Sequence, residues 1–396
     1  MEPYAVIAPA PSNAPIGIYI HVPYCSRICP YCDFNVYARL QSQFPDYVDA
    51  ILNEIDLVAG QQGHREVATV FLGGGTPSLL PSWGHERIMD RLSRRFSIAA
   101  DAEISMEANP EGLEADYLRE IRSAGINRLS IGVQTQQAHG LKVLGRAHKP
   151  ETPIRGIAAA REAGFDNLSL DFIFGWPGQT LDDWERDLDF MLDTNPEHAS
   201  MYSLIIEPNT PYQTAVNRGI LLSVDDDMVS EMYEMTLERM ATAGWDHYEI
   251  SNWARAPELR SRHNLIYWRN AEYIALGPGA HGHLSGHRFH NLLLPERYID
   301  AVSRGELPVA ESEEIDPATA IAETMMLGLR LTSDGVSSLA FERRHGFRMS
   351  DIYSETIAYL REIGMLEWNE DSLRLTRAGL LIANEVAERF LDPVLP

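Results

Sequence analysis

Short hydrophobic runs alternate with longer amphipathic segments along the first two thirds of the chain. The short runs are rich in Val, Ile, Leu, Phe and Tyr, are bounded by turn residues, and predict strands at 17–22, 67–72, 103–107, 128–133, 167–173 and 199–205. The segments after them have helical spacing and predict helices at about 45–60, 84–96, 114–124, 151–163, 180–194 and 225–243. Repeated strand and helix units predict an α/β fold with a parallel sheet, because parallel strands need such crossovers.

The pattern changes in the last third of the chain. Residues 245–300 are dense in His, Trp, Tyr and Gly and show no clear periodicity, whereas helical spacing returns at 318–331 and 350–363. A short hairpin is expected at 365–375, followed by a helix over 376–391 that buries Leu380, Ala383, Ala387 and Leu391. Helices followed by a small hairpin predict a smaller, mostly helical, winged-helix-like C-terminal domain. We therefore expect a Pro-rich tail at 1–16, a core at 17–245, a His- and aromatic-rich segment at 246–315 that completes the core, and an accessory domain at 316–396.

Composition narrows the classes of function. Hydrophobic residues make up 45% of the 396, which suits a large core, and 33 basic against 57 acidic residues give a net charge of −24. This balance argues against nucleic-acid binding, including DNA binding by the C-terminal domain, since phosphate binding needs a basic face. We find no apolar run long enough for a membrane helix and no signal or transit peptide at the N-terminus, so we expect a cytoplasmic protein.

Cysteine usage is the most unusual feature. The three cysteines, Cys25, Cys29 and Cys32, lie within eight residues directly after the first predicted strand. An odd, clustered set is a poor disulfide framework, whereas three thiolates in a CxxxCxxC loop suit a four-iron cluster that keeps one iron open. Two alternatives are a zinc site with His21 as fourth ligand and a chance grouping of buried cysteines.

Unusual polar residues occur at the carboxyl ends of the predicted strands. Gly73–Gly75 and Thr76 follow the second strand, and each later strand ends in or carries one such residue: Glu107, Gln134, Asp171 and Ser203. Ligands bind at this edge of parallel α/β folds, so the placement favours a barrel-like sheet with a pocket at that edge.

Several motifs carry a resemblance to a known family. YIHVPYC, FLGGGTPSLL, SMEANPEGL, NRLSIGVQT, LGRAH, LDFIFGWPGQT and HNLIYW extend along most of the chain. Together with the CxxxCxxC loop, they resemble the radical S-adenosylmethionine (SAM) superfamily, in its coproporphyrinogen oxidase-related branch, and are most similar to the HemW-type haem chaperones. The resemblance implies a partial six-stranded (β/α) barrel with a smaller C-terminal domain.

The resemblance also implies roles for individual residues. Cys25, Cys29 and Cys32 would hold a [4Fe-4S] cluster whose open iron binds SAM. The residues expected to contact SAM or lie beside the cluster are Tyr19, Tyr31, Gly74, Gly75, Thr76, Glu107, Gln134, Arg146, Asp171 and Ser203. Each of these polar residues could alternatively serve a structural ion pair or turn.

Two features bear on the function that the resemblance implies. The oxidase carries a further cysteine two positions after the last cluster ligand, where this chain has Phe34, and HNLIYW matches a motif of the chaperones. His263 in that motif is therefore the candidate haem ligand, with a hydrogen-bonded structural histidine as the alternative. A metal-binding role for the tract GAHGHLSGHRFH is a weaker possibility.

The leading hypothesis is a haem chaperone that binds haem, a [4Fe-4S] cluster and SAM and passes haem to an unidentified acceptor protein. That acceptor could be membrane-bound and contacted transiently. The alternatives are an oxygen-independent coproporphyrinogen III oxidase and an interaction or nucleic-acid module built on the C-terminal domain. The sequence leaves open whether SAM is cleaved.

Overall fold

The computed structural model describes residues 14–62, 65–222, 225–369 and 371–394, so most of the tail expected over 1–16 lies outside the described residues. The chain divides into two compact units: Met1–Arg239 with Glu272–Glu313, and Met240–Ala271 with Glu314–Pro396. The segment expected over 246–315 is therefore split, and only its second part belongs to the unit that contains the predicted strands. Among the described residues, no helix is both long and apolar enough to cross a membrane.

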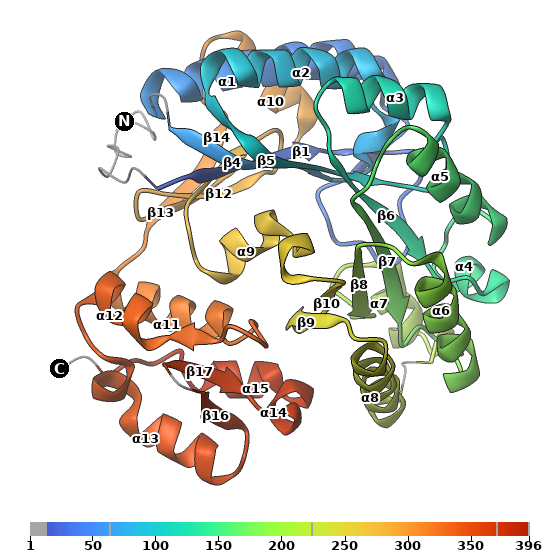
Figure 1. Cartoon of the computed structure of the whole chain (residues 1–396). Helices are drawn as coiled ribbons and strands as arrows, with labels where there is room; N and C mark the ends of the chain where they lie inside the picture. Colours follow the sequence, from blue (N-terminus) through green and yellow to red (C-terminus); the bar gives the residue numbers. More distant parts are fainter. Residues whose placement is uncertain (1–13, 63–64, 223–224, 370, 395–396) are drawn as a thin grey trace. The chain divides into compact units, whose positions relative to one another are not determined.

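Six parallel strands form the centre of the first unit (Figure 1). In spatial order they are β1 (Ile16–Val22), β4 (Glu66–Gly74), β5 (Ser97–Ala108), β6 (Arg128–Gln134), β7 (Leu168–Phe174) and β8 (His198–Ser203). The helices that follow them are α1 (Phe44–Gln62), α2 (Ser82–Arg95), α3 (Ala115–Ser123), α5 (Glu151–Glu162), α6 (Leu181–Thr194) and α8 (Asp226–Thr242). The predicted strands and helices are confirmed, and so is the α/β fold with a parallel sheet.

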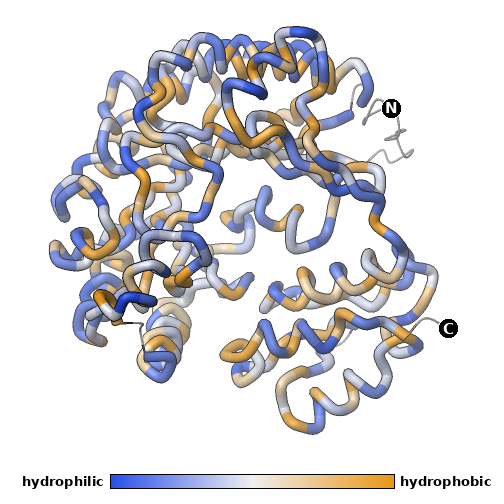
Figure 2. The backbone as a smooth tube through the Cα atoms, turned by 180° about the vertical axis from the view of Figure 1, so that it is seen from behind, coloured by the Kyte–Doolittle hydropathy of each residue, from blue (hydrophilic) through white to orange (hydrophobic). Residues whose placement is uncertain are grey.

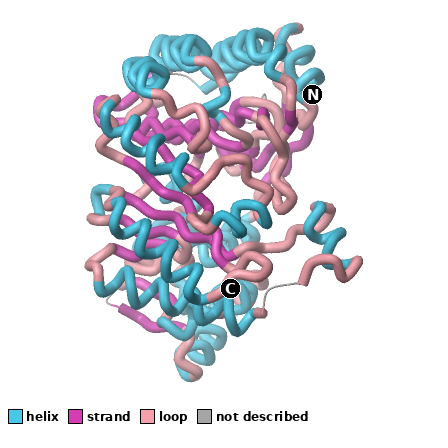
Figure 3. The backbone as a smooth tube through the Cα atoms, turned by 90° about the vertical axis from the view of Figure 1, so that its right-hand side faces the viewer, coloured by secondary structure: helices cyan, strands magenta, loops and turns pink. Residues whose placement is uncertain are grey.

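Helices cover the outer face of this curved sheet, as the side view shows (Figure 3). The strands are buried along most of their length, β1 and β7 almost completely, because helices cover one face and the other faces the interior. Along α1 the buried Val48, Ile51 and Ile55 follow helical spacing, and hydrophobic and hydrophilic positions alternate along the tube in Figure 2. The hydrophobic pattern of the sequence thus determines which face of each element is covered.

Additional elements extend the sheet beyond β1. β11 (Tyr273–Leu276) pairs in parallel with β1, and β12 (His281–Leu284) and β13 (His287–Asn291) follow as antiparallel strands, with β14 (Val309–Glu314) next to β13. The remaining elements of the unit are α10 (Pro295–Ser303), α4 (Ala138–Val143), α7 (Pro211–Asn217), the short pair β2 (Tyr24–Cys25) and β3 (Tyr37–Ala38), and the turns Gln41–Gln43 and Pro77–Leu79. These elements lie where the sequence showed no clear periodicity or only short segments.

The second unit has its own core and a small sheet. Its helices are α9 (Arg262–Trp268), α11 (Pro317–Gly328), α12 (Ser338–His345), α13 (Met349–Glu362), α14 (Arg377–Leu381) and α15 (Ala383–Glu388). Its strands are the pair β9 (Asp246–Glu249) and β10 (Asn252–Ala254) and the three-stranded sheet β15 (Val336–Ser337), β17 (Ser372–Leu375) and β16 (Leu366–Asn369), and the turn Pro257–Leu259 precedes α9. Buried residues from α11, α12, α13 and the hairpin form one cluster, as expected for a winged-helix-like domain.

The prediction of one terminal helix over 376–391 is wrong, because the chain breaks between α14 and α15. Ile382 has φ −126° and ψ 39°, which is outside helical geometry. The break allows Val386 and Phe390 to enter the core, whereas Leu391, which was expected to be buried, is 47% exposed. No proline or glycine stands at Ile382, and the break coincides with the packing of these two side chains into the core.

Candidate functional site

The three cysteines lie on one loop at the carboxyl end of β1. Cys25 ends β2, which pairs with β3, and the Cys32 amide donates to the Cys29 carbonyl at 3.2 Å. All three are free thiols of intermediate exposure. Pairing of β2 with β3 closes the loop at its base, so the loop presents its three thiols at the edge where the sequence predicted a pocket.

The glycine motif after β4 contacts this loop directly. The Gly75 amide donates to the Val22 carbonyl at 2.9 Å, and the Thr76 amide donates to the Tyr24 carbonyl at 2.8 Å. The buried Thr76 hydroxyl donates to Cys25 Sγ at 3.6 Å. The motif and the first cysteine therefore form one structural element.

The structure gives its own reason for glycine at 74 and 75. Gly74 has φ +107°, and a Cβ there would overlap the His21 imidazole. A Cβ on Gly75 would lie 2.7 Å from the Tyr24 carbonyl oxygen. Close packing within the chain thus requires these glycines, and their contact with SAM stays a prediction.

A second contact to the loop comes from Arg146, which follows α4. A Cβ on Gly145 (φ +67°) would overlap the Pro30 ring, so the glycine lets the chain pass closely behind the loop. Arg146 is largely buried and its Nη1 donates to Cys29 Sγ at 3.7 Å, while its Nη2 donates to Asn109 Oδ1 at 2.5 Å. Arg146 thus faces the cluster loop as well as the carboxyl end of β5.

Asn109 connects the two contacts and was missed by the sequence reasoning. Its Nδ2 donates to Thr76 Oγ1 at 3.2 Å, while its Oδ1 accepts from Arg146. A continuous chain of hydrogen bonds therefore joins Cys25 to Cys29 through Thr76, Asn109 and Arg146. The signal in the sequence was its place two residues after Glu107, at the end of the same strand.

Two aromatic residues flank the loop. Tyr31 lies between the last two cysteines and contacts the Tyr212 ring edge-on, with centroids 6.2 Å apart. Tyr19 on β1 stacks on Phe71 and hydrogen-bonds to His21 Nδ1 at 2.8 Å. His21 Nε2 lies 2.9 Å from the Asn35 carbonyl, so both nitrogens of this imidazole are already engaged within the protein. The arrangement gives no support to a zinc site with His21 as fourth ligand.

The predicted carboxylates converge inside the barrel. Glu107 Oε2 accepts from the Gly74 amide at 3.0 Å, and burial, together with the Asp171 carboxylate, raises the pKa of Glu107 to about 8. Asp171 accepts from the hydroxyl of Ser130 at 2.8 Å and of Ser169 at 3.2 Å, and burial raises the pKa of Asp171 despite these bonds. The register pairs Glu107 with Ser130 and Asp171 with Ser200, so the acids face the same interior. Such acids suit hydroxyl or ammonium donors of a ligand.

Gln134 ends β6 in a strained conformation. Its φ is +65° and the register with β7 shifts there, which marks a bulge that re-aims the side chain. Ser203 is half-buried at the end of β8, beside Gly175. Both residues therefore lie at the carboxyl edge of the sheet, as predicted.

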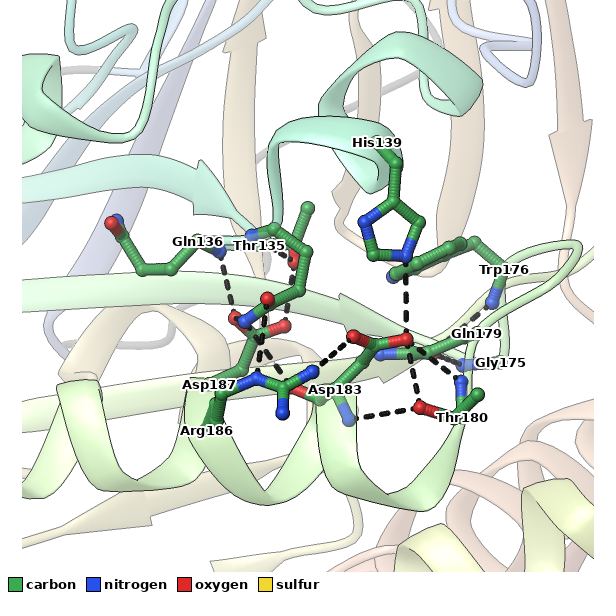
Figure 4. A network of polar contacts seen from close by, with 11 residues as sticks. Thr135, Gln136, His139, Gly175, Trp176, Gln179, Thr180, Asp183, Arg186 and Asp187 are labelled. Atoms are coloured by element: carbon green, nitrogen blue, oxygen red, sulfur yellow. Dashed lines mark hydrogen bonds and ion pairs between the residues drawn. The ribbon is translucent and has the colours of Figure 1, made fainter.

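A polar network fixes the segment directly after Gln134 (Figure 4). Asp187 on α6 accepts from the Thr135 hydroxyl at 2.6 Å, the Gln136 amide at 2.7 Å and Gln137 Nε2 at 3.1 Å. One turn earlier, Thr180 and Asp183 form the N-terminal capping box of α6. Burial raises the pKa of Asp187 to about 6. The sequence reasoning missed Asp187. This residue holds the segment that follows Gln134, the strained residue that is predicted to contact SAM.

The donor set fits an iron–sulfur cluster. Three free thiols come from one loop, and a hydroxyl and a guanidinium direct donors at two of the sulfurs. Burial raises the pKa of the Cys25 thiol, and it raises the pKa of Cys32 to about 11. Iron would offset this cost by stabilising the thiolates. No three His, Cys, Asp or Glu side chains in the described part converge on one metal ion. Cluster thiolates bind different irons and need no such convergence.

His263 belongs to the second unit, whereas the cysteines belong to the first. It lies on α9, is fully buried, and its Nε2 is 2.8 Å from the Tyr267 hydroxyl. Burial lowers its pKa to about 3, so the imidazole is neutral. His263 is therefore hydrogen-bonded in the structure. Its Nε2 can bind iron only after the hydrogen bond to the Tyr267 hydroxyl is broken.

Comparisons with known proteins agree with the geometry. The family model "Radical SAM superfamily" matches residues 19–191, and "HemN C-terminal domain" matches 315–382. The chain is 38% identical to the Heme chaperone HemW of Bacillus subtilis over 94% of this chain and 98% of that protein. It is 36% identical to the Heme chaperone HemW of Mycobacterium tuberculosis over 97% of both.

Among solved structures, coproporphyrinogen III oxidase (HemN) from Escherichia coli matches with a TM-score of 0.82 at 22% identity. The match covers 95% of this chain and 90% of that one. The similarity extends over both units and shows that the fold is shared.

Proposed function

This chain belongs to the radical SAM superfamily, in the family of the heme chaperones named HemW, and on that basis we propose that it is itself a haem chaperone. In this proposal it binds haem and transfers it to an acceptor protein. The observation that carries the proposal is the similarity to the chaperones along almost the whole of both chains. The acceptor and a cytoplasmic site of action are part of the proposal. The net charge of −24 argues against nucleic acid as a binding partner and thus favours a protein partner.

The cofactors of the family have a fitting set of residues here. Cys25, Cys29 and Cys32 would hold a [4Fe-4S] cluster, which supplies an open iron for the amine and carboxylate of SAM. The proposed SAM contacts are the residues predicted from the resemblance: Tyr19, Tyr31, Gly74, Gly75, Thr76, Glu107, Gln134, Arg146, Asp171 and Ser203. In support, the hydrogen bonds from Thr76 to Cys25 and from Arg146 to Cys29 join two of these motifs to the cysteine loop.

For haem we propose His263 as an iron ligand. Its neutral imidazole is the ligating form, and Nε2 would exchange its hydrogen bond to Tyr267 for the iron. The experiment is an anaerobic haem titration of reconstituted protein, followed by the Soret band. We expect stoichiometric binding in the wild type, weaker binding in His263→Ala, and tighter binding in Tyr267→Phe, which removes the hydroxyl bonded to His263 Nε2. Absence of stoichiometric binding in the wild type would contradict the proposal.

The alternative function is oxygen-independent coproporphyrinogen III oxidation, which the shared fold with HemN allows. Phe34, which is 63% exposed, stands where the resemblance places a further cysteine of the oxidase. We therefore expect no decarboxylated product when reduced, reconstituted protein is incubated with SAM and coproporphyrinogen III. Formation of protoporphyrinogen would favour the oxidase.

A further inference from the structure

One exposed histidine of the first unit is not used by the site described above. His281 on β12 lies directly opposite His290 on β13, with ring centroids 5.1 Å apart. The His290 nitrogens are engaged: Nδ1 lies 3.2 Å from the Asn291 carbonyl and Nε2 lies 3.5 Å from a Glu311 carboxylate oxygen. In the described part of the chain, His281 has no hydrogen bond or ion pair through its ring. His281 therefore presents an unengaged imidazole on the surface.

A buried carboxylate holds the turn that presents this histidine. Glu54 on α1 is fully buried and accepts from the Gly277 amide at 2.8 Å, from Asn291 Nδ2 at 2.7 Å and from the Tyr298 hydroxyl at 2.5 Å. The Asn291 amide in turn donates to the Ala280 carbonyl at 2.9 Å, next to His281. The imidazole thus stands on a fixed base, although it is exposed itself.

The histidine lies beside the cysteine loop. Burial lowers the pKa of His21, and His281 is near enough to lower it further. His21 is hydrogen-bonded to the Asn35 carbonyl in the cysteine loop. The Asn35 side chain also donates to the Pro278 carbonyl at 3.1 Å and to the Leu293 carbonyl at 2.9 Å. Asn35, which follows Phe34, is thus bonded both to the segment before the β12–β13 hairpin and to the segment after it.

Large apolar side chains are exposed on the joined segments. Phe34 is 63%, Leu293 50% and Leu294 47% exposed. Exposed apolar patches commonly mark binding surfaces, and these three side chains lie on segments that the Asn35 hydrogen bonds join. On the hairpin, the half-exposed Arg288 lies on the same strand face as His290. Its guanidinium, which is paired with Glu313 at 3.5 Å on the surface, is a cation near His281 with further donors for a second carboxylate.

These features match the chemistry of haem: an iron that takes a neutral imidazole, an apolar macrocycle, and carboxylates that pair with a cation. We propose that His281 is an iron ligand of a surface haem site on the first unit, with Phe34, Leu293 and Leu294 as apolar contacts and Arg288 as a propionate partner. This inference rests on the proposed function and deepens it. A solvent-exposed ligand suits a carrier, because an acceptor protein reaches the haem without prior unfolding of the carrier.

The test is an anaerobic haem titration of the reconstituted full chain, comparing wild type with His281→Gly and His287→Gly. His287 lies on the same hairpin and serves as the matched control. We expect the Kd for haem to rise at least about tenfold in His281→Gly, with iron and sulfide content unchanged, and to stay at the wild-type value in His287→Gly. Free imidazole is expected to restore the Soret spectrum of His281→Gly, a rescue that a merely structural role would not give.

Two outcomes separate this inference from the proposed function. Wild-type affinity and spectrum in His281→Gly, together with lost binding in His263→Ala, would overturn the surface site and leave the chaperone proposal standing. No binding by the wild type would overturn both. If His281→Gly lost its cluster or its fold, Phe34→Ser would decide: a raised Kd supports the surface site, and an unchanged Kd overturns it.

Discussion

Replacing Glu54 by Gln is expected to make the stability of the first unit less dependent on pH. Burial raises the pKa of this carboxyl from 4.5 to about 7, although three hydrogen-bond donors partly oppose the shift. At 1.36 kcal/mol for each pH unit, keeping Glu54 ionised costs the folded state about 3 kcal/mol. Because the folded pKa is raised, this cost is absent below pH 4.5, develops as the pH rises, and is complete above about 7.

The variant also loses an acceptor. Glu54 accepts from three donors, and an amide at this position directs its own NH₂ group at one of them. An unsatisfied buried donor costs about 1–3 kcal/mol, so Glu54→Gln is expected to be less stable than the wild type at pH 5. Since the wild type alone loses stability as its carboxyl ionises, its advantage over Glu54→Gln is expected to fall by about 2.5 kcal/mol between pH 5 and pH 8, which nearly cancels or reverses it.

The assay is urea denaturation at pH 5 and pH 8, with hydrogen exchange of the peptide 272–291 as a local readout of the Gly277 amide. Glu86→Gln, on the exposed face of α2, controls for the change in net charge. A difference in unfolding free energy between wild type and Glu54→Gln that stays constant from pH 5 to pH 8 would refute the reasoning.

Three further predictions concern the cysteine loop and the pocket edge. Gly145→Ala is expected to destabilise the cysteine loop and lower iron incorporation on reconstitution, because its Cβ overlaps Pro30. The control is Gly164→Ala, which has a similar backbone penalty (φ +88°) but no atom within 4 Å of the new Cβ. This control variant is expected to incorporate iron like the wild type. Asn109→Ala is expected to leave Arg146 and Thr76 without their shared partner and to weaken SAM binding in equilibrium dialysis, with unchanged SAM affinity as the contrary result. Asp187→Asn directs an amide donor at the donors of residues 135–137 and is expected to lose about 1–3 kcal/mol in thermal unfolding and to weaken SAM binding, while an unchanged Tm would show that the network is dispensable.

The elements of the barrel were predictable because local patterns determine them. Each parallel strand is a short buried run, and Thr180 and Asp183 mark the start of α6 through a local cap. The cysteines and the residues at the carboxyl ends of strands were also predictable, because a parallel sheet brings those ends to one edge.

Features that depend on packing between distant segments were not predictable. Asn109 and Asp187 gain their roles from partners on other elements, and nothing in their own segments indicates those partners. The break at Ile382 has no proline or glycine to announce it. The burial of His263 likewise follows from the surroundings of α9, and the motif alone left a haem ligand and a hydrogen-bonded structural histidine as alternatives.

The central claim is that this chain carries haem. The most direct measurement is gel filtration of anaerobically reconstituted protein after incubation with haem, with haem and iron–sulfur content determined in the same fraction. The proposed function predicts stoichiometric haem in the protein fraction. It also predicts that this haem is transferred to an added apo-haem protein. Haem that elutes entirely apart from a protein with an intact cluster would contradict it.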